Sequence, residues 1–363
     1  MEASMKVLIS YIYCTRGGVE TAIKNRIKNI SDKEVSFDLL FFWDYGGKDI
    51  LQDLSCQIII ENDLTKIGEL IVRNNYDAVI TIDTYDMITV LNNINYSGQR
   101  ILEVHTTYEE QLRYLKNLKE GDVSTILVPS NYQAKYIEQF LKVPVPIEIM
   151  PNSLDTSVFY ERNMAGVKPD KKILLWIGRL DEHKNWRLFL EIAENMKKST
   201  DDSYEYWVVG GMNSDELEKK KFFEMIEKKD LMAEVRWIPA VSYEKIANIY
   251  SYAAKSGGAY ISTSKNESFG MTALEAMACG CPVILNDVGG LSELGAEGRG
   301  LVLEMGDVGK VVEAVKNYLN CERCSEVRLK AEKYVVSMYS EKIVQQKFRC
   351  LLEMDKGKDC EKK

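Results

Sequence analysis

Patterns of short buried strands alternate with helical patterns along almost all of this chain. Apolar runs rich in Val, Ile and Leu, about 4–8 residues long, are each followed by a segment whose apolar residues recur at helical spacing. Such alternation is typical of parallel sheets whose strands are joined by crossover helices. The sequence therefore predicts an α/β protein built on doubly wound parallel sheets.

The predicted strands fall into two groups. The first group lies at residues 6–10, 37–43, 57–61, 78–83, 101–105, 125–129 and 147–151, with helices near 19–30, 63–74, 108–119 and 131–141. The second group lies at 173–178, 206–210, 235–239, 259–263, 283–286 and 300–303, with helices near 185–198, 214–229, 242–254, 270–279 and 307–320. A chain of 363 residues is too long for one ordinary core, and the polar stretch 155–172 separates the groups. We therefore expect two Rossmann-like domains, residues 1–160 and residues 166–335.

Composition narrows the classes of partner. Apolar residues make up 45% of the chain and charged residues 28%, as in soluble globular proteins, and no apolar run is long enough to cross a bilayer. The first strand begins at Lys6 without a signal peptide, and the eight cysteines are irregularly spaced, so we expect reduced cysteines and a cytoplasmic protein. Residues 1–165 hold 16 Lys and Arg against 23 Asp and Glu, a net charge of −7 out of −8 for the chain. This charge argues against a nucleic-acid partner and leaves membrane association at most peripheral.

Residues 266–290 carry the most specific pattern, NESFGMTALEAMACGCPVILNDVGG. Glu267 lies in a predicted turn, and Glu275 lies two turns along the short apolar helix that follows. Two carboxylates at this spacing can hold two hydroxyl-bearing ends of one elongated ligand. The backbone amides of Phe269, Gly270 and Met271 at the helix start suit an anion between those ends. A nucleotide sugar has this layout, whereas an amphipathic helix with solvent-facing acids would not need the Phe-Gly turn or the Gly-Cys-Pro stop.

A basic pair follows the first strand of the second group. The strand ends at Gly178, and Arg179 and Lys184 follow it at five-residue spacing. Ligands of open α/β sheets bind at the carboxyl ends of strands, so the two cations can converge there on one anion. Arg supplies a fixed fork of donors and Lys a mobile point charge. A surface loop with two solvated cations is the alternative.

Two features of the first group are weaker signals. Gly17 and Gly18, between the first strand and the first helix, would let the backbone approach a phosphate closely, although many strand–helix turns contain glycine. His105 ends a predicted strand and is one of two histidines in the chain. Spacing alone favours a structural role for this histidine.

Taken together, these segments resemble the retaining glycosyltransferases of family 4, which have the GT-B architecture. The resemblance rests on Glu267 and Glu275 with Phe-Gly between them, on the Glu-Ala-Met-Ala-Cys-Gly-x-Pro-Val that follows, on Gly-Arg-x-x-x-x-Lys ending at Lys184, and on Gly-Gly-x-Glu near the N-terminus. Ser268 stands where many members have Gly, and Ser153 departs from their usual Asn-Gly-x-Asp. The resemblance is close over residues 125–305 and thin in the N-terminal half. It implies two domains facing a cleft, with residues 341–354 crossing back onto the first.

The resemblance also implies roles for individual residues. Glu267 would contact the transferred sugar and Glu275 the ribose hydroxyls, while His105 would line the reaction centre. The remaining donor-binding residues would be the diphosphate clamp Arg179 and Lys184, the phosphate-facing Gly17 and Gly18, the helix-start segment Ser268, Phe269, Gly270 and Met271, and Ile238, whose backbone would lie at the nucleotide base. The first domain would bind the acceptor and the second the donor.

The implied activity is transfer of a hexose or N-acetylhexosamine from a nucleoside diphosphate sugar, linked to UDP or GDP, to a carbohydrate or small-molecule hydroxyl. The reaction would retain the anomeric configuration and need no metal or other cofactor, since the chain contains no Asp-x-Asp. Alternatives are a catalytically silent sugar-nucleotide-binding subunit and a GT-B-fold epimerase or phosphorylase. The acidic N-terminal half favours a cationic or neutral acceptor. The sequence does not identify the donor base, the sugar, the acceptor or the oligomeric state.

Overall fold

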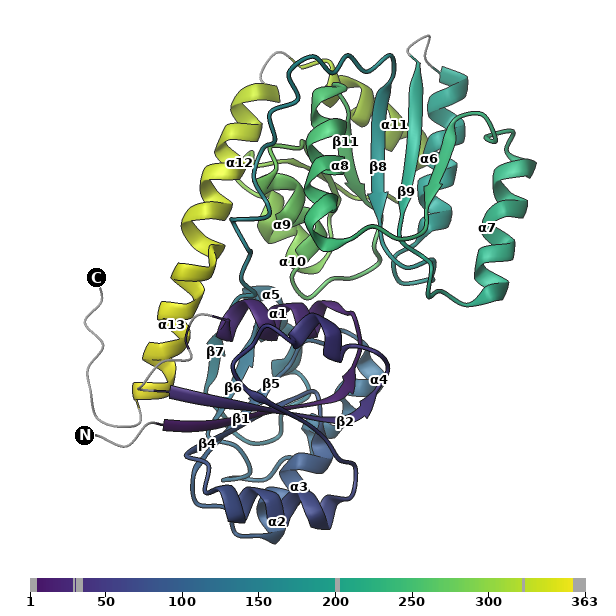
Figure 1. Ribbon diagram of the computed structural model, residues 1–363. Helices are drawn as coiled ribbons and strands as arrows, with labels where there is room; N and C mark the ends of the chain where they lie inside the picture. The colour runs from purple at the N-terminus through teal and green to yellow at the C-terminus, as the bar shows by residue number, and fades with distance from the viewer. Residues whose placement is uncertain (1–4, 29, 31–34, 200–202, 322–323, 355–363) are drawn as a thin grey trace. The chain divides into compact units, whose positions relative to one another are not determined.

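The computed structural model of the chain describes residues 5–28, 30, 35–199, 203–321 and 324–354 (Figure 1). The chain divides into two compact units. The first unit comprises Met1–Ser153 and Glu341–Lys363, and the second comprises Leu154–Ser340. The stretch 155–172, expected to be a linker, belongs to the second unit, because Leu154 and Phe159 are buried in its core.

The first unit contains seven described parallel strands in the order β3-β2-β1-β4-β5-β6-β7. They are β1 (Met5–Cys14), β2 (Val35–Asp44), β3 (Gln57–Ile60), β4 (Ala78–Ile82), β5 (Gln99–Glu103), β6 (Thr125–Val128) and β7 (Ile147–Ile149). The helices are α1 (Gly18–Ile27), α2 (Leu64–Asn74), α3 (Tyr85–Asn93), α4 (Glu109–Leu112), α5 (Asn131–Glu138) and α13 (Glu341–Met354), with short 3-10 helices η1 (Lys48–Leu51) and η2 (Arg113–Asn117). The prediction of one helix over residues 108–119 is wrong in extent, because two short helices, α4 and η2, form there instead.

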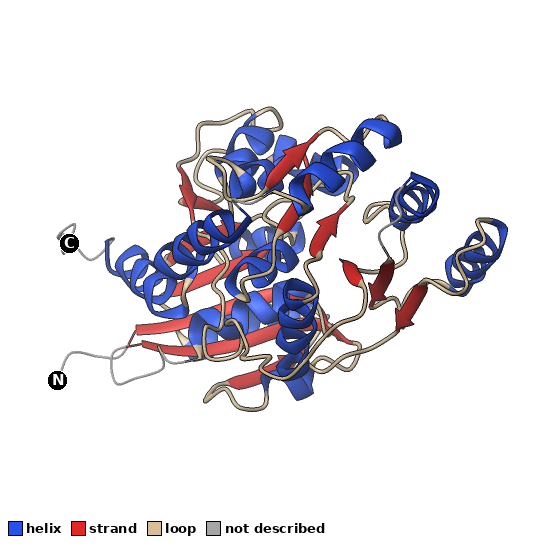
Figure 2. Ribbon diagram, turned by 90° about the horizontal axis from the view of Figure 1, so that it is seen from above, coloured by secondary structure: helices blue, strands red, loops and turns tan. Residues whose placement is uncertain are grey.

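Both faces of this sheet are covered by helices (Figures 1 and 2). On β1, Val7 and Ile9 pack in a cluster that includes Phe348 of α13, whereas Leu8 packs in the opposite cluster with Ile67 of α2. A strand buried on both faces reads as a continuous apolar run, which explains the pattern in the sequence. The final helix, α13, packs against α1 in the first unit, where the resemblance placed residues 341–354.

The second unit contains six described parallel strands in the order β10-β9-β8-β11-β12-β13. They are β8 (Lys172–Ile177), β9 (Tyr204–Val209), β10 (Val235–Ile238), β11 (Ala259–Ser262), β12 (Val283–Asn286) and β13 (Leu301–Leu303). The helices are α6 (Trp186–Ser199), α7 (Glu216–Lys228), α8 (Tyr243–Lys255), α9 (Met271–Ala278), α10 (Gly289–Gly295), α11 (Val308–Leu319) and α12 (Cys324–Tyr339). The predicted fold class, two doubly wound parallel-sheet units, is therefore confirmed.

The strand orders place one switch point in each sheet. In the first unit the chain runs outward from β1 to β3 and then returns to β4 on the other side of β1; in the second it runs from β8 to β10 and returns to β11 beside β8. Loops diverge at such points, and open α/β sheets bind ligands in the crevice beside them. The sheet topology thus selects the loops after β1 and β4, and those after β8 and β11.

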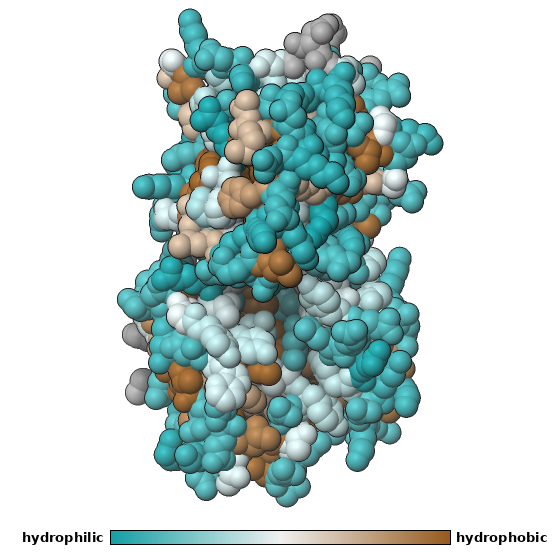
Figure 3. Space-filling model, turned by 90° about the vertical axis from the view of Figure 1, so that its right-hand side faces the viewer, coloured by the Kyte–Doolittle hydropathy of each residue, from teal (hydrophilic) through white to brown (hydrophobic). Residues whose placement is uncertain are grey.

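Hydrophilic side chains cover most of the face shown in Figure 3. No helix among the described residues is long and apolar enough to span a membrane. Five described cysteines are free: Cys14, Cys56, Cys279, Cys281 and Cys321. Cys350 is disulfide-bonded, so the expectation of fully reduced cysteines is wrong at that position.

Candidate functional site

The loop after β8 is anchored to the end of β11 by hydrogen bonds. The Thr263 hydroxyl donates to the carbonyl oxygens of Lys184 and Asn185, at 3.1 and 2.9 Å, and accepts from the Trp176 indole N–H at 3.0 Å. Asn185 adopts a left-handed backbone with φ 55°, which asparagine tolerates better than most residues. The loop carrying Lys184 is therefore held at the switch point by a buried threonine that the sequence analysis did not identify.

Lys184 and Glu267 form an ion pair at this point. The Lys184 ammonium contacts Glu267 Oε1, which also accepts a hydrogen bond from the Ser264 hydroxyl at 2.7 Å. The two side chains are only 22% and 15% exposed. Burial opposes ionisation of Glu267, but the Lys184 charge outweighs it and lowers the pKa of that carboxyl. Glu267 is thus held as an anion beside a cation.

Arg179 lies apart from that pair. Its side chain is 66% exposed, and its Nε lies 3.0 Å from Asp181 Oδ2. Asp181 Oδ1 also accepts from the backbone N–H of Lys184 at 2.8 Å. The Arg179 guanidinium and the Lys184 ammonium therefore contact different carboxylates, Asp181 and Glu267. Asp181 contacts both residues, and the sequence analysis did not identify it. Its only sign in the sequence was its position between the two cations.

The start of α9 presents backbone amides. Gly270 has φ 98°, a backbone conformation that favours glycine, and a Cβ there would also push on Leu291 Cδ2 at 2.6 Å. Phe269 is buried and meets the Tyr339 ring edge-to-face at 5.3 Å. No described acceptor takes a hydrogen bond from the amides of Phe269, Gly270 or Met271. This helix start can therefore bind an anion through free N–H groups.

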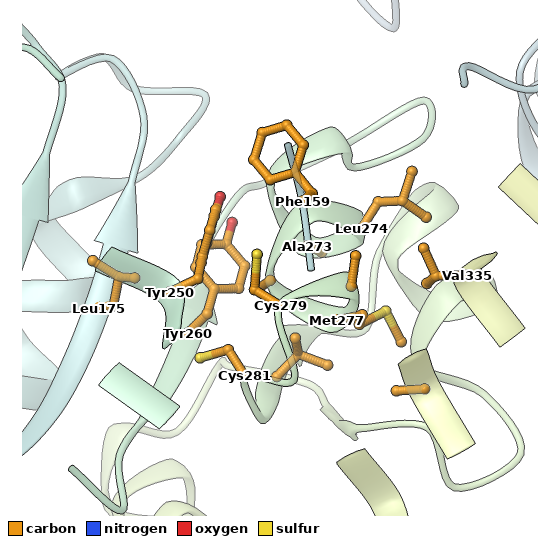
Figure 4. Packing of buried hydrophobic residues seen from close by; sticks show 14 of the residues in the cluster. Phe159, Leu175, Tyr250, Tyr260, Ala273, Leu274, Met277, Cys279, Cys281 and Val335 are labelled. Atoms are coloured by element: carbon orange, nitrogen blue, oxygen red, sulfur yellow. The ribbon is translucent and has the colours of Figure 1, made fainter. Parts of the chain in front are cut away.

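Glu275 lies on α9 among apolar and aromatic side chains. Figure 4 shows Tyr250 and Tyr260 side by side next to this helix, and the Tyr250 hydroxyl donates to Glu275 at 2.9 Å. Burial raises the pKa of Glu275 to about 7, against the opposing effects of that hydrogen bond and of the Lys184 charge. Lys184 thus acts electrostatically on both Glu267 and Glu275. The structure brings these three predicted residues together.

Two glycines at the start of α10 support the Glu267 loop. Gly289 has φ 57°, and a Cβ there would lie 2.2 Å from the Glu267 carbonyl oxygen. The backbone N–H of Gly290 donates to the same oxygen at 2.7 Å, and a Cβ on Gly290 would lie 2.8 Å from the Phe269 Cα. The backbone of Gly289 and Gly290 thus packs directly against the backbone of the Glu267 loop and fixes it. In the sequence, the Gly-Gly pair after β12 indicated this close approach.

Two further predicted residues lie in neighbouring loops of the second unit. Ser268 follows Glu267 in the loop before α9. Ile238 ends β10 with its side chain half-buried, and its carbonyl oxygen accepts from the Gly210 N–H at 2.9 Å. The carbonyl of Ile238 therefore already accepts one hydrogen bond, as does the carbonyl of Pro239, from the Met212 N–H at 3.2 Å.

In the first unit, the glycine loop after β1 is organised by Glu20. The buried Glu20 carboxylate accepts from the Thr15 N–H at 2.5 Å and from the Thr15 hydroxyl at 2.7 Å. A Cβ on Gly17 would lie 2.8 Å from Glu20 Oε2, whereas one on Gly18 would meet nothing within 4 Å. A side chain at Gly17 would therefore displace the Glu20 or Thr15 side chain, whereas Gly18 has open space beside it. Glu20, the acid of the Gly-Gly-x-Glu pattern, therefore holds the loop after β1 in place through its hydrogen bonds with Thr15.

His105 follows β5 in the first unit and belongs to a buried charged cluster. Its Nε2 lies 2.7 Å from Glu103 Oε1, and Glu103 in turn pairs with Arg26 of α1. Asp83, which follows β4, accepts from the His105 backbone N–H. Sequence analysis identified only the histidine. Among the described residues, no group of three or more His, Cys, Asp or Glu side chains could hold a metal ion.

Comparison with known proteins gives a family match for part of the chain. Residues 160–336 match the family model described as glycosyl transferases group 1. The D-inositol 3-phosphate glycosyltransferase of Paenarthrobacter aurescens is 31% identical over 160 residues, 42% of this chain and 38% of that protein. The probable sucrose-phosphate synthase of Thermosipho melanesiensis is 27% identical over 203 residues, 53% of this chain and 47% of that protein. The chain thus spans less than half the length of these relatives, and the family match lies within the second unit.

Solved structures are similar over both units. Anabaena Alr3699/HepE, in complex with UDP and glucose, has a TM-score of 0.80 at 16% identity, covering 96% of this chain and 100% of that chain. Sucrose-phosphate synthase from Thermosynechococcus elongatus has a TM-score of 0.78 at 17% identity, covering 98% and 100%. At such low identity the similarity establishes the fold alone, which is the two-domain α/β architecture predicted from the sequence.

Proposed function

We propose that the protein is a retaining, metal-independent glycosyltransferase that moves a hexose or N-acetylhexosamine from a nucleoside diphosphate sugar to an acceptor hydroxyl. The observation that carries the proposal is the ion pair of Lys184 with Glu267, with Lys184 also acting electrostatically on Glu275, while the amides at the start of α9, between the two acids in sequence, donate to no described acceptor. Two carboxylates, one partly buried cation and a helix end that can bind an anion would suit a ligand with hydroxyls at both ends and phosphate between them.

In this proposal, the diphosphate lies against the amides of residues 269–271 and the Lys184 ammonium. Negative charge grows on the phosphate as the bond to the sugar breaks, and preorganised donors stabilise that charge. Arg179 is exposed, and Asp181 is its one ion-pair partner among the described residues, so its guanidinium can turn toward the phosphate when donor binds. The leaving phosphate accepts the acceptor proton, and the acceptor oxygen attacks from the same face.

The two acids take different roles because their environments differ. Glu267 is kept anionic by Lys184 and positions the hydroxyls of the sugar. Glu275 lies in an apolar surrounding that raises its pKa to about 7, so near neutral pH it can be protonated before donor binds. A hydrogen-bonded carboxyl at this place suits the ribose hydroxyls.

We place the acceptor in the first unit. There β1 and β2 continue past the ends of their neighbours, with Tyr13 opposite Trp43 and the Tyr13 and Tyr45 rings 5.8 Å apart. All three rings are exposed. The C–H faces of neutral sugar rings pack on such aromatic surfaces, and the net charge of −7 over residues 1–165 disfavours an anionic acceptor. This supports a neutral carbohydrate as acceptor.

The decisive experiment incubates the purified full chain with a panel of UDP- and GDP-sugars and follows products by mass spectrometry. The proposal expects slow release of nucleoside diphosphate from one donor, and faster release when a neutral acceptor is added. Nucleotide-sugar binding without turnover of any donor would instead support a silent binding subunit. Interconversion of two sugars on the same nucleotide would support an epimerase, and phosphate-dependent release of a sugar phosphate would support a phosphorylase.

A further inference from the structure

A buried ion pair joins α1 to β5 in the first unit. Arg26 Nη1 and Nη2 donate to the two oxygens of Glu103 at 2.6 and 2.7 Å, and both side chains are almost fully buried. The guanidinium also lies over the Phe348 ring at 5.2 Å. Its Nε has no hydrogen-bond partner among the described residues. Burying a charged pair with one donor unsatisfied stabilises a fold poorly compared with apolar packing, so the pair points to a role beyond stability.

That role concerns His105. Burial opposes ionisation of Glu103, but the Arg26 guanidinium outweighs it and holds the pKa of this carboxyl well below its usual range. An ionised carboxylate can only accept hydrogen bonds. Since Glu103 Oε1 lies 2.7 Å from His105 Nε2, that nitrogen must carry the hydrogen.

The backbone of His105 is fixed as well. Asp83, held at φ 47°, accepts from the N–H of His105 at 3.2 Å and from that of Thr106 at 3.1 Å. The imidazole is 8% exposed, and its Nδ1 has no hydrogen-bond partner among the described residues. A nitrogen left without a partner on a ring buried to this extent, at the carboxyl end of β5, is available to a ligand.

We infer that Arg26 and Glu103 are positioning residues, which hold His105 in the Nε2–H form so that Nδ1 accepts a hydrogen bond from a substrate hydroxyl. The identity of that substrate as a sugar rests on the proposed function. In the neutral ring the second nitrogen is an acceptor, so the site selects a hydroxyl or N–H donor and disfavours an anion. The alternative is that the pair only ties α1 to the sheet and leaves the tautomer unconstrained.

The state of the ring can be measured directly, because the chain has two histidines. Nitrogen-15 NMR of the full chain distinguishes the two neutral tautomers, and His183→Gln assigns the remaining signals to His105. We expect the Nε2–H tautomer in the wild type. In Glu103→Gln the amide can donate or accept, and we expect a mixture of tautomers. A predominantly Nδ1–H ring in the wild type would overturn the inference, whether or not the protein transfers sugar.

Kinetics then separate positioning from stability. We expect Glu103→Gln to lower kcat about 10- to 100-fold, with the donor KM little changed, the range found for carboxylates that orient metal-binding histidines. Arg26→Lys keeps the charge and should retain more activity than Arg26→Met. Glu218→Gln is a matched control, because Glu218 of α7 also pairs with an arginine, Arg187 of α6, but in the second unit and with no described bond to His105.

The outcomes are distinct from those for the proposed function. Equal kcat in Glu103→Gln and Glu218→Gln, with an unchanged His105 spectrum, would leave the pair a purely structural tie and defeat the inference. If Glu103→Gln fails to fold, the tautomer seen in the wild-type spectrum and the activity of Arg26→Lys still test the inference. Absence of transfer by the wild type with the Nε2–H tautomer present would defeat the proposed function and leave the inference about the ring intact.

Discussion

Lys184 and Glu267 are 83 positions apart in the chain, yet their side chains form an ion pair at the switch point of the second sheet. The ion pair holds the lysine in place, and with 22% of its side chain exposed the lysine is partly withdrawn from water. A bound diphosphate would compete with the carboxylate for the same ammonium. The pair therefore holds the Lys184 cation in position, and a phosphate that binds this cation must displace the Glu267 carboxylate from it.

Replacing Lys184 by Ala should lower donor turnover by roughly 100- to 1000-fold, because one preorganised charge partner of the leaving group is lost. Initial rates of nucleoside diphosphate release measure the effect, with circular dichroism to verify folding. Lys265→Ala is the control, since this exposed lysine pairs with Glu182 close to the same loops. Near-native rates in a folded Lys184→Ala protein would contradict the assignment.

Glu275→Ala should weaken binding of the nucleoside diphosphate, because the carboxyl that we assign to the ribose hydroxyls is removed. Isothermal titration calorimetry with free UDP and GDP measures the change. Tyr250→Phe, which deletes only the hydroxyl that donates to Glu275, should weaken binding less. Equal affinities in wild type and Glu275→Ala would refute the ribose role.

The raised pKa of Glu275 predicts a pH dependence of stability. Its pKa rises from 4.5 to about 7 on folding, so between these values the folded protein binds more protons at this site than the unfolded chain. The free energy of unfolding should then fall as pH rises through that window and level off above about pH 7. Glu275→Gln lacks this titration, so its stability relative to wild type should improve from about pH 5 to about pH 8 in urea denaturation. Parallel curves for the two proteins would show that Glu275 is ionised throughout.

Gly289→Ala should disturb the site more than an ordinary glycine substitution. A left-handed backbone costs a non-glycine residue about 1–2 kcal/mol, and at Gly289 the new Cβ would also collide with the Glu267 carbonyl. Gly298→Ala is the matched control, because Gly298 has φ 73° with open space around it. We expect comparable strain in both but a fall in kcat only for Gly289→Ala. Similar rates in both variants would mean that the Glu267 loop tolerates displacement.

Trp43→Ala should raise the acceptor KM while leaving donor hydrolysis in the absence of acceptor unchanged, since an aromatic face for the acceptor ring is removed. The measurement uses the neutral acceptor found in the donor screen. Tyr160→Ala, at an exposed ring of the second unit, is the control. A rise in KM of the same size in both variants would rule out the ring cluster Tyr13, Trp43 and Tyr45 as the acceptor surface.

Local sequence carries much of the candidate site, because its key residues lie in short motifs at strand ends. Glu267, Gly270 and Glu275 fall within nine consecutive positions, and the strand and helix periods around them predict the turn and the helix. The orientation of Arg179 could not be predicted in this way. Both Asp181 and Glu267 are within reach of a cation on this loop, and only the packed loop decides which cation each acid binds.

The sequence by itself determined the parallel-sheet class, the positions of the strands, and the motif residues after β8 and β11, since these depend on periodicity and spacing within a few residues. Only the tertiary structure revealed three sets of contacts. Thr263 holds the loop of Lys184, Gly289 packs under the Glu267 loop, and Arg26 is connected through Glu103 to His105. Each of these contacts joins segments far apart in the chain. Its energy depends on burial and on distances of a few ångströms, which no local pattern encodes.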